Sequence, residues 1–273
     1  ILVLHSLQEE IRVKNEVVEL ATNSYADIIY PRGYEYLKEF KLVKGFTESK
    51  WVVGKATVSK SIYMVPGFNG VLINYRVRGN EKVKIYVKPL ITYRSIYSLV
   101  KEPFKIEVEP YRNGFRAKLA SDLLNVYVSE GIFYPNEQEE LKRWYWNFFY
   151  TKDYERGEDC VEHAYNPGTF LSEGKNFSFW LVASFNDVLT ELPSDAVKKE
   201  LARREFKVSK LRQVLLIAGR NHLLIDKPGI VAGFHWFGEW GRDTFISLPG
   251  IVLTQKMFDL AEQIFERWLS YAK

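Results

Sequence analysis

Hydrophobic and polar residues alternate along much of the first half of the chain. From Val71 to Val77 and from Val83 to Lys88, apolar positions recur at every second residue, which is the period of a strand with one buried face. Gly79 and Asn80 lie between the two stretches and are typical turn residues. The pattern therefore predicts a β-hairpin over residues 71–88.

A second hairpin is predicted around Asn113-Gly114, because both residues tolerate positive φ. Its strands are expected at Phe104–Val108 and Phe115–Leu119, with further strands at 52–64, 124–128 and 177–185. Many short strands separated by turn residues are typical of a large antiparallel sandwich. We expect such a β-sandwich domain to occupy residues 1–190.

A helical period appears first between residues 136 and 149. Asn136 is a candidate helix cap, and Glu139 stands three residues on in the capping-box position. Leu141, Trp144, Tyr145 and Phe148 follow at helical spacing. The spacing predicts a packed helix within the β-rich region.

Beyond residue 190 the chain is expected to be mainly helical. Residues 191–207 are expected to form a linker helix with a solvated basic face. Beyond residue 208 apolar residues recur at i, i+3, i+4 and i+7, and a helix is expected from Thr244 to Leu253, bent or broken near Pro249-Gly250. The last twenty residues carry an apolar stripe from Met257 to Leu269, which predicts an amphipathic helix.

Residues 229–250 are unlike an ordinary core segment. Bulky aromatic residues and His235 surround Glu239, Arg242 and Asp243, and glycines punctuate the stretch. Aromatic faces beside a few polar groups suit a small polar ligand such as a sugar, whose C–H faces stack on tryptophan. The alternative is structural: core aromatics, a histidine satisfied within its loop, and a surface Arg-Asp ion pair of little energetic consequence.

Composition narrows the function classes. The 273 residues include 38 basic and 34 acidic ones, for a net charge of +4, and no dense basic patch indicates nucleic-acid binding. The single cysteine, Cys160, excludes an internal disulfide and a cysteine metal cluster, and the four histidines lack metal-ligand spacing, so we expect no metal and no cofactor. No apolar run reaches membrane-spanning length and the start is a poor signal peptide, so no membrane association and a cytoplasmic location are expected.

Residues 240–250, Trp-Gly-Arg-Asp-Thr-Phe-Ile-Ser-Leu-Pro-Gly, resemble the start of the catalytic domain of glycogen-debranching enzymes of the amylo-α-1,6-glucosidase family. The family motif reads roughly W-F-x-x-W-G-R-D-T-x-I-x-L-P-G, and the match here begins at Trp236-Phe237. The resemblance implies that residues 208–273 begin an (α/α)6 six-hairpin barrel. The sequence offers only the first helices of such a barrel, so we expect the barrel to be incomplete in this chain.

The strand-rich region also resembles the N-terminal domain of that family. The match includes Pro31-Arg32-Gly33, Val58–Tyr63, Val83–Leu90 and Arg94. The family has further strands before this region, including an R-K-Y-H-G-type segment that is not found here, and the chain lacks an initiator methionine. We therefore expect a domain truncated at its start. Residues 150–159 are similar to a family E-x-x-R-G segment, and a charged loop is favoured there over a site carboxylate.

Hydrolysis of a glycosidic bond usually takes two carboxyl groups. The resemblance implies inverting hydrolysis of α-1,6-glucosidic bonds with Asp243 as the general acid. Trp236, Trp240 and Phe245 would desolvate Asp243 and favour its protonated form, whereas hydrogen bonds from Arg242 would oppose this.

A rival role for the same residues comes from other helical-barrel glycosidases, such as glucoamylases. There an Arg-Asp pair holds the terminal sugar and a different carboxylate is the acid. Under that interpretation Glu239 becomes the acid candidate, and in a helical loop it would share a face with Asp243 at i, i+4. We favour Asp243 as the acid. The residues expected to contact substrate are Arg242, Trp236, Trp240, Glu239 and Phe237.

The second carboxylate of the family lies downstream, and Asp259, Glu262 and Glu266 lie on a plain amphipathic helix. We therefore expect the general base to be missing from this chain. The expected ligand is an α-glucan or glycogen oligosaccharide. The expected partner is a complementing chain carrying the rest of the barrel, or a second copy through self-association of exposed helix faces. The alternatives are a non-catalytic carbohydrate-binding or assembly module, and a glucoamylase-like α-glucosidase.

Overall fold

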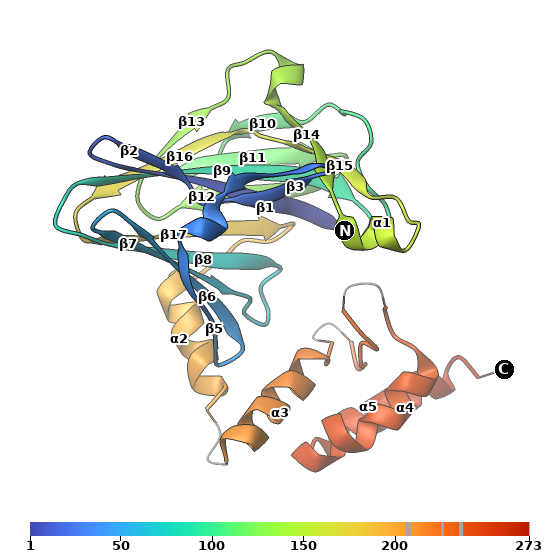
Figure 1. Ribbon diagram of the computed structural model, residues 1–273. Helices are drawn as coiled ribbons and strands as arrows, with labels where there is room; N and C mark the ends of the chain where they lie inside the picture. Colours follow the sequence, from blue (N-terminus) through green and yellow to red (C-terminus); the bar gives the residue numbers. More distant parts are fainter. Residues whose placement is uncertain (206–208, 225–226, 235–236, 273) are drawn as a thin grey trace. The chain divides into compact units, whose positions relative to one another are not determined.

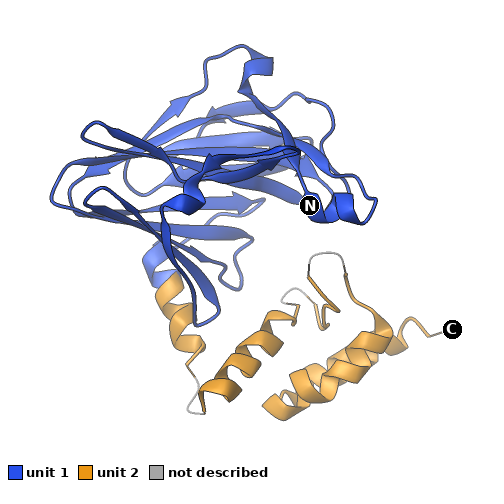
Figure 2. Ribbon diagram, in the orientation of Figure 1, with its two compact units in different colours: residues 1–196 blue, residues 197–273 orange. Residues whose placement is uncertain are grey.

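The computed structural model describes residues 1–205, 209–224, 227–234 and 237–272 (Figure 1). The chain divides into two compact units, Ile1–Ala196 and Val197–Lys273, which Figure 2 shows in different colours. The boundary falls within helix α2 (Pro193–Arg203). Each unit is described by itself below.

The first unit, every residue of which is described, consists of antiparallel β-sheets. The seven-stranded sheet has the order β13-β16-β9-β1-β2, with β15 joining β14 to β9. Its strands are β1 (Leu2–Val13), β2 (Glu16–Glu19), β9 (Val83–Arg94), β13 (Ile132–Pro135), β14 (Trp144–Phe149), β15 (Val161–Tyr165) and β16 (Gly168–Gly174).

The eight-stranded sheet runs β10-β11-β12-β17-β8-β7-β6-β5. Its strands are β5 (Leu37–Val43), β6 (Phe46–Val53), β7 (Ala56–Tyr63), β8 (Gly70–Arg78), β10 (Glu107–Pro110), β11 (Gly114–Leu119), β12 (Asp122–Val128) and β17 (Phe177–Phe185). A two-stranded hairpin, β3 (Thr22–Tyr25) and β4 (Ile28–Arg32), and the short helices η1 (Gly33–Glu35), η2 (Glu140–Arg143) and α1 (Thr151–Glu155) complete the unit.

The two large sheets share one hydrophobic core, which confirms the predicted antiparallel sandwich. Ile85 and Val87 of β9 are fully buried in the same cluster as Val77 of β8 and Leu181 of β17. The carboxylate of Glu9 lies between the sheets and accepts hydrogen bonds from Lys60 and Tyr75 of the opposite sheet, both at 2.6 Å. The buried carboxylate is thereby compensated, as a charge in a low-dielectric core must be.

The predicted hairpin over residues 71–88 is wrong, although both of its strands exist. Strand β8 pairs with β7 and β17, whereas β9 pairs with β1, β15 and β16 in the other sheet. The short connection after Arg78 therefore crosses between the layers. The stretch 52–64 is likewise two strands, β6 and β7, because Gly54 turns the chain with φ of 55°.

The second predicted hairpin is present, since β10 and β11 pair with Pro110 opposite Phe115, but its first strand covers residues 107–110 and not the predicted 104–108. Its turn chemistry differs from the expectation. Arg112, with φ of 49°, is the turn residue in the left-handed region. Gly114 is needed for a different reason: a Cβ there would lie 2.1 Å from the main-chain oxygen of Val126 on β12.

The predicted helix over 136–149 is also wrong. The segment forms the loop after β13, then η2, and then strand β14, which pairs with β15. Between Tyr145 and Phe148 the register shifts by one residue, and Asn147 has φ of 62°. This β-bulge puts Tyr145 and Phe148, three residues apart, in one hydrophobic cluster, whereas Trp144 packs in the sandwich core, so a bulged strand imitates a helical spacing.

A buried polar network joins the start of the chain to β15. Glu162 is fully buried, forms an ion pair with Arg94 and accepts a hydrogen bond from the Tyr150 hydroxyl at 2.5 Å. The ring of His5 lies 2.9 Å from the same hydroxyl. Burial lowers the pKa of His5, and the nearby carboxylate of Glu162 only partly opposes this.

The second unit is helical. It holds the end of α2, α3 (Lys210–Asn221), α4 (Gly241–Ile251), η3 (Leu253–Gln255) and α5 (Phe258–Leu269). A helix is therefore found at 193–203, within the predicted linker of residues 191–207, of which residues 206–207 lie outside the described residues, and the predicted C-terminal helix is confirmed. Helix α4 begins three residues earlier than expected and continues past Pro249 to Ile251. The hydrophobic core of the second unit is formed by Ile230, Leu248, Val252, Ala261 and Ile264.

Candidate active site

The segment before α4 is a loop fixed by main-chain hydrogen bonds. The amide of Val231 donates to the carbonyl of His222 at 2.8 Å, and the amide of Ala232 donates to Gly238 at 2.9 Å. Phe237 forms an isolated β-bridge with Gly233. These bonds fix the described residues 231–234 and 237–240 of the loop that leads to α4.

Helix α4 carries the Arg-Asp pair in its first turn. Trp240 is the extended residue before the helix, and the amide of Thr244 donates to its carbonyl at 2.9 Å. Asp243 is the third residue of the helix, where a carboxylate interacts favourably with the helix dipole. Gly241 leaves space for the indole of Trp268, because a Cβ there would lie 3.2 Å from that ring.

The side chains of Arg242 and Asp243 have no hydrogen-bond or ion-pair partner among the residues that the structure describes. Arg242 is exposed and Asp243 is half-buried. The predicted surface pair between the two is therefore not formed. A half-buried carboxylate and a guanidinium that are both unpaired remain available to bond a hydroxylated ligand.

The aromatic rings that neighbour this pair in the sequence are largely exposed. Phe237 is 54% exposed and Trp240 is 56% exposed, and the two rings meet edge to face with centroids 6.5 Å apart. Phe245 packs instead against Phe265 of α5, at 5.1 Å. Asp243 is itself half-buried, and its desolvation by Trp240 and Phe245 stays a prediction. Trp236 and His235 lie outside the described residues.

Glu239 has a structural partner that the sequence did not predict. Its carboxylate accepts two hydrogen bonds from the Arg267 guanidinium, at 2.6 and 2.7 Å, and lies 2.7 Å from the Lys227 ammonium. The Arg267 hydrogen bonds lower the pKa of Glu239, and Lys227 adds to this, although partial burial opposes them. We call this group of Lys227, Glu239 and Arg267 the carboxylate latch.

The carboxylate latch explains why residue 229 is a glycine, and it changes the role expected of Glu239. A Cβ on Gly229 would lie 2.1 Å from Oε1 of Glu239, so the carboxylate occupies the space that a side chain would need. Arg267 also donates to the carbonyl of Pro228 at 2.5 Å, which ties the loop to α5. Glu239 precedes the helix, so the i, i+4 relation with Asp243 that a helical loop would create does not exist.

The remaining candidate carboxylates lie in ordinary positions. Asp259, Glu262 and Glu266 are exposed on α5. In the 150–159 segment, Arg156 bonds Asp153 at 3.0 Å and Glu158 at 2.8 Å, as a charged surface loop does. Among the described residues, no three histidine, cysteine or acidic side chains gather as a metal site, and no helix is long and apolar enough to span a bilayer.

Two family models match the sequence. A model described as glycogen debranching enzyme N terminal matches residues 1–178, and a model described as amylo-alpha-1,6-glucosidase matches residues 204–273. Together they cover most of the sandwich and, from residue 204 on, the helical unit with the Arg-Asp pair. No curated protein matches significantly.

Among solved structures, the chain is similar to a bacterial glucoamylase complexed with acarbose. The similarity has 10% sequence identity and a TM-score of 0.38, and it covers 84% of this chain. The chain spans only 37% of the length of that structure. A likeness this distant supports no assignment of fold or function.

Proposed function

Because this chain belongs to the glycogen debranching enzyme family, we propose that it is the sandwich and first barrel segment of a glycoside hydrolase. The proposed reaction is inverting hydrolysis of α-1,6-glucosidic branch stubs of glycogen or a related α-glucan, in the cytoplasm. Asp243 is the proposed general acid. Arg242, Trp236, Phe237 and Trp240 hold the sugar.

One observation carries this proposal. The side chains of Arg242 and Asp243, in the first turn of α4, have no hydrogen-bond or ion-pair partner among the described residues. Structural charges at a fixed helix start are usually neutralised by neighbours, as Glu239 is by Arg267 and Lys227. Arg242 and Asp243 have no such partner among the described residues, and the exposed faces of Phe237 and Trp240 lie next to them in the chain. This combination suits a sugar, which offers both hydroxyls and C–H faces.

The latch also favours Asp243 over Glu239 as the acid. A general acid must hold a proton near the working pH. The Arg267 and Lys227 side chains keep Glu239 ionised by lowering its pKa. Glu239 therefore serves better to fix the loop than to protonate a leaving oxygen, and its proposed contribution to substrate binding is through the position of that loop.

The general base and the rest of the barrel are proposed to come from a complementing polypeptide segment. Helix α3 exposes Leu211, Val214 and Leu215, and α4 exposes Ile246, which is 73% accessible. Amphipathic helices bury such stripes in a completed domain. In an inverting enzyme the base would stand about 6.5–9.5 Å from Asp243, leaving room for the attacking water.

The test is glucose release from a phosphorylase limit dextrin. The chain would be assayed alone, and then with the downstream barrel segment of a family member added or fused. Activity is expected only with the added segment. Asp243→Asn should then lower the rate by roughly 10²–10⁴-fold, the usual contribution of a general acid.

Asp259→Asn is the matched control, because Asp259 is an exposed aspartate on α5, and it should leave the rate unchanged. Oligosaccharide binding without glucose release, in a folded and completed barrel, would contradict the hydrolase proposal. It would favour a carbohydrate-binding or assembly module instead.

A further inference from the structure

Polar side chains of β1 and β9 form a floor on the outer face of the seven-stranded sheet. Both strands are far in the sequence from the Arg-Asp pair. In the antiparallel pairing of β1 with β9, Gln8 lies opposite Lys88 and Glu10 lies opposite Tyr86. The alternate positions on these strands, such as Ile11 and Val87, are buried in the core. Because strand side chains alternate between faces, the polar set points away from the core.

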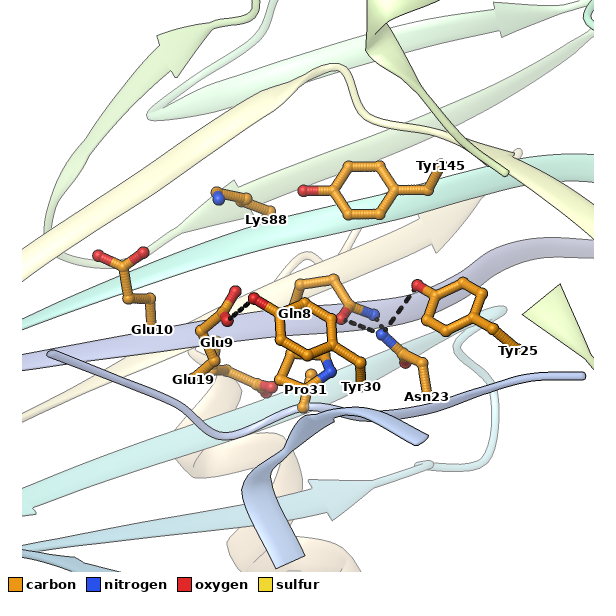
Figure 3. A pocket seen from close by; sticks show the side chains of 11 residues that line it. Gln8, Glu9, Glu10, Glu19, Asn23, Tyr25, Tyr30, Pro31, Lys88 and Tyr145 are labelled. Carbon is orange, nitrogen blue, oxygen red and sulfur yellow. Dashed lines mark hydrogen bonds between the residues drawn. The ribbon is translucent and has the colours of Figure 1, made fainter. Parts of the chain in front are cut away.

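The β3–β4 hairpin forms one wall above this floor, as Figure 3 shows. Asn23 and Gln8 exchange two side-chain hydrogen bonds, at 2.8 and 3.3 Å. The Tyr30 hydroxyl donates to Glu19 at 2.9 Å. At the base of the hairpin, Gly33 approaches so closely that a Cβ would lie 1.9 Å from the main-chain oxygen of Leu20. These contacts fix the wall in place.

Residues 134–142 form the opposite wall, and Asn166 fixes it. The buried Asn166 amide donates to the carbonyls of Pro89 and Gly168, at 3.1 and 2.9 Å, and its side-chain oxygen accepts from Asn136 at 3.1 Å. Arg143 donates to the Gln138 carbonyl at 2.6 Å. A wall held by so many bonds loses little conformational entropy when a ligand binds.

Two cavities lie between these walls and adjoin at Lys88 and Tyr145, which line both. The smaller, about 60 Å³, is lined by Tyr25 and Tyr30, among others. The larger, about 400 Å³, is lined by Tyr134 and the polar residues of the second wall. That volume is within the range of about 300–1,000 Å³ that small-molecule sites occupy. We call the two cavities together the outer groove.

At the junction, two polar groups have no partner in the fully described sandwich. The ammonium of Lys88 and the hydroxyl of Tyr145 make no side-chain hydrogen bond or ion pair there, although both side chains are half-buried. Burial raises the pKa of Tyr145, so its hydroxyl remains a proton donor at neutral pH. Groups of this kind, fixed by packing and left unpaired, are what orient a ligand in a site.

The lining also limits the class of ligand. The lining holds Glu10, Glu19 and Glu137 besides Lys88 and Lys142, so it has no excess of positive charge that would favour a polyanion such as nucleic acid. Amide, carboxylate, ammonium and phenol groups outnumber aliphatic ones, so it does not favour a purely apolar ligand either. Exposed rings of Tyr30 and Tyr134 stand at the two ends. Aromatic faces together with many donors and acceptors fit a neutral, hydroxyl-rich chain.

We propose that the outer groove of the sandwich is a second carbohydrate-binding site, which holds a linear oligosaccharide along Tyr30, Lys88, Tyr145 and Tyr134. The choice of an α-1,4-linked glucan as the oligosaccharide rests on the proposed function of the chain. The groove itself is argued from its own geometry and does not depend on the role of Asp243. The outer groove would retain a polymeric substrate by binding one of its glucan branches while another branch is cleaved.

The experiment is isothermal titration of the whole 273-residue chain with maltoheptaose, with cellohexaose as the β-linked comparison. Maltoheptaose should bind, and Lys88→Ala with Tyr134→Ala should weaken binding at least about tenfold, which equals about 1.4 kcal/mol. Lys84→Ala and Tyr154→Ala are the matched controls: Lys84 is on the same strand outside the groove, and Tyr154 is an exposed tyrosine elsewhere. Neither should change the affinity.

Hydrogen exchange on the unmodified chain gives a second measurement that needs no variant. Maltoheptaose should slow exchange in residues 22–32 and 134–142. Absence of binding at millimolar oligosaccharide, or equal affinity in the groove variants, would overturn the proposal. Binding of cellohexaose alone would overturn the choice of an α-glucan. Binding that is abolished by Arg242→Ala with Asp243→Asn would place the site at α4 instead. Because binding and glucose release are measured separately, failure of the groove is distinguishable from failure of the hydrolase proposal.

Discussion

Removal of the Arg267 guanidinium is expected to loosen the second unit without unfolding the first. Arg267→Met keeps an unbranched side chain of similar length but removes both hydrogen bonds to Glu239 and the bond to the Pro228 carbonyl. Hydrogen bonds to charged groups contribute about 1.5–3 kcal/mol each. The Glu239 side chain is 11% exposed and the Arg267 side chain 20%, so partial hydration recovers some of the loss.

Lys227 would still hold the carboxylate, which reduces the loss further. We therefore expect a net cost of about 2–3 kcal/mol, rather than the roughly 3–5 kcal/mol of a fully buried pair that is broken. Local opening of the 227–240 loop and α5 should then be about 30- to 150-fold more frequent. Hydrogen exchange measured by mass spectrometry on the whole chain would report this for each segment.

Glu239→Gln and the double variant complete a double-mutant cycle, which isolates the coupling between the two side chains. Arg156→Met is the control, because Arg156 forms ion pairs with Asp153 and Glu158 on an exposed loop, where such pairs contribute about 0–1 kcal/mol. Unchanged exchange in residues 227–271 of Arg267→Met would refute the claim that the latch fixes the loop.

Three further predictions follow from other contacts. Gly229→Ala would place a Cβ 2.1 Å from the Glu239 carboxylate, and we expect about 1–3 kcal/mol of destabilisation in urea unfolding. Because burial lowers the pKa of His5, its contribution to stability is complete above the ordinary value of 6.5 and is lost as the pH falls through the lowered folded pKa; His5→Gln should flatten this part of the stability-pH curve. Leu215 is exposed on α3, so sedimentation velocity should show self-association that Leu215→Lys reduces; a chain that is monomeric at high concentration would contradict this.

The sequence predicted the sandwich well but predicted some of its pairings wrongly. Alternation identifies a strand because it reports one buried face, and the strands at 71–77 and 83–88 are both present. It does not identify the partner of a strand. The connection between β8 and β9 is short enough for a hairpin, yet the two strands pair in different sheets, because their pairing depends on distant strands such as β1 and β17.

The false helix at 136–149 has a different cause. A period of four residues is evidence for a helix only when the backbone is regular. In β14 the bulge at Asn147 adds one residue between Tyr145 and Phe148, and this rotates Phe148 onto the face of Tyr145, away from Trp144. The high aromatic content of the segment favours a strand, but the spacing of its apolar residues resembles that of a helix.

The separate roles of the acidic residues in the candidate site could not be predicted from the sequence. Residue types near α4 predicted which side chains were chemically able to act, but Glu239 and Asp243 are both acidic residues in one glycine-rich, aromatic segment. What separates them is their neighbours: Arg267, 28 residues further on, pairs with Glu239, whereas no described side chain pairs with Asp243. A carboxylate with two cationic partners is held in its charged form, and one without partners is free to bond a ligand hydroxyl. The assignment of roles therefore depends on a long-range contact between the loop and α5, and substitutions at Arg267 test it as directly as substitutions at Asp243 do.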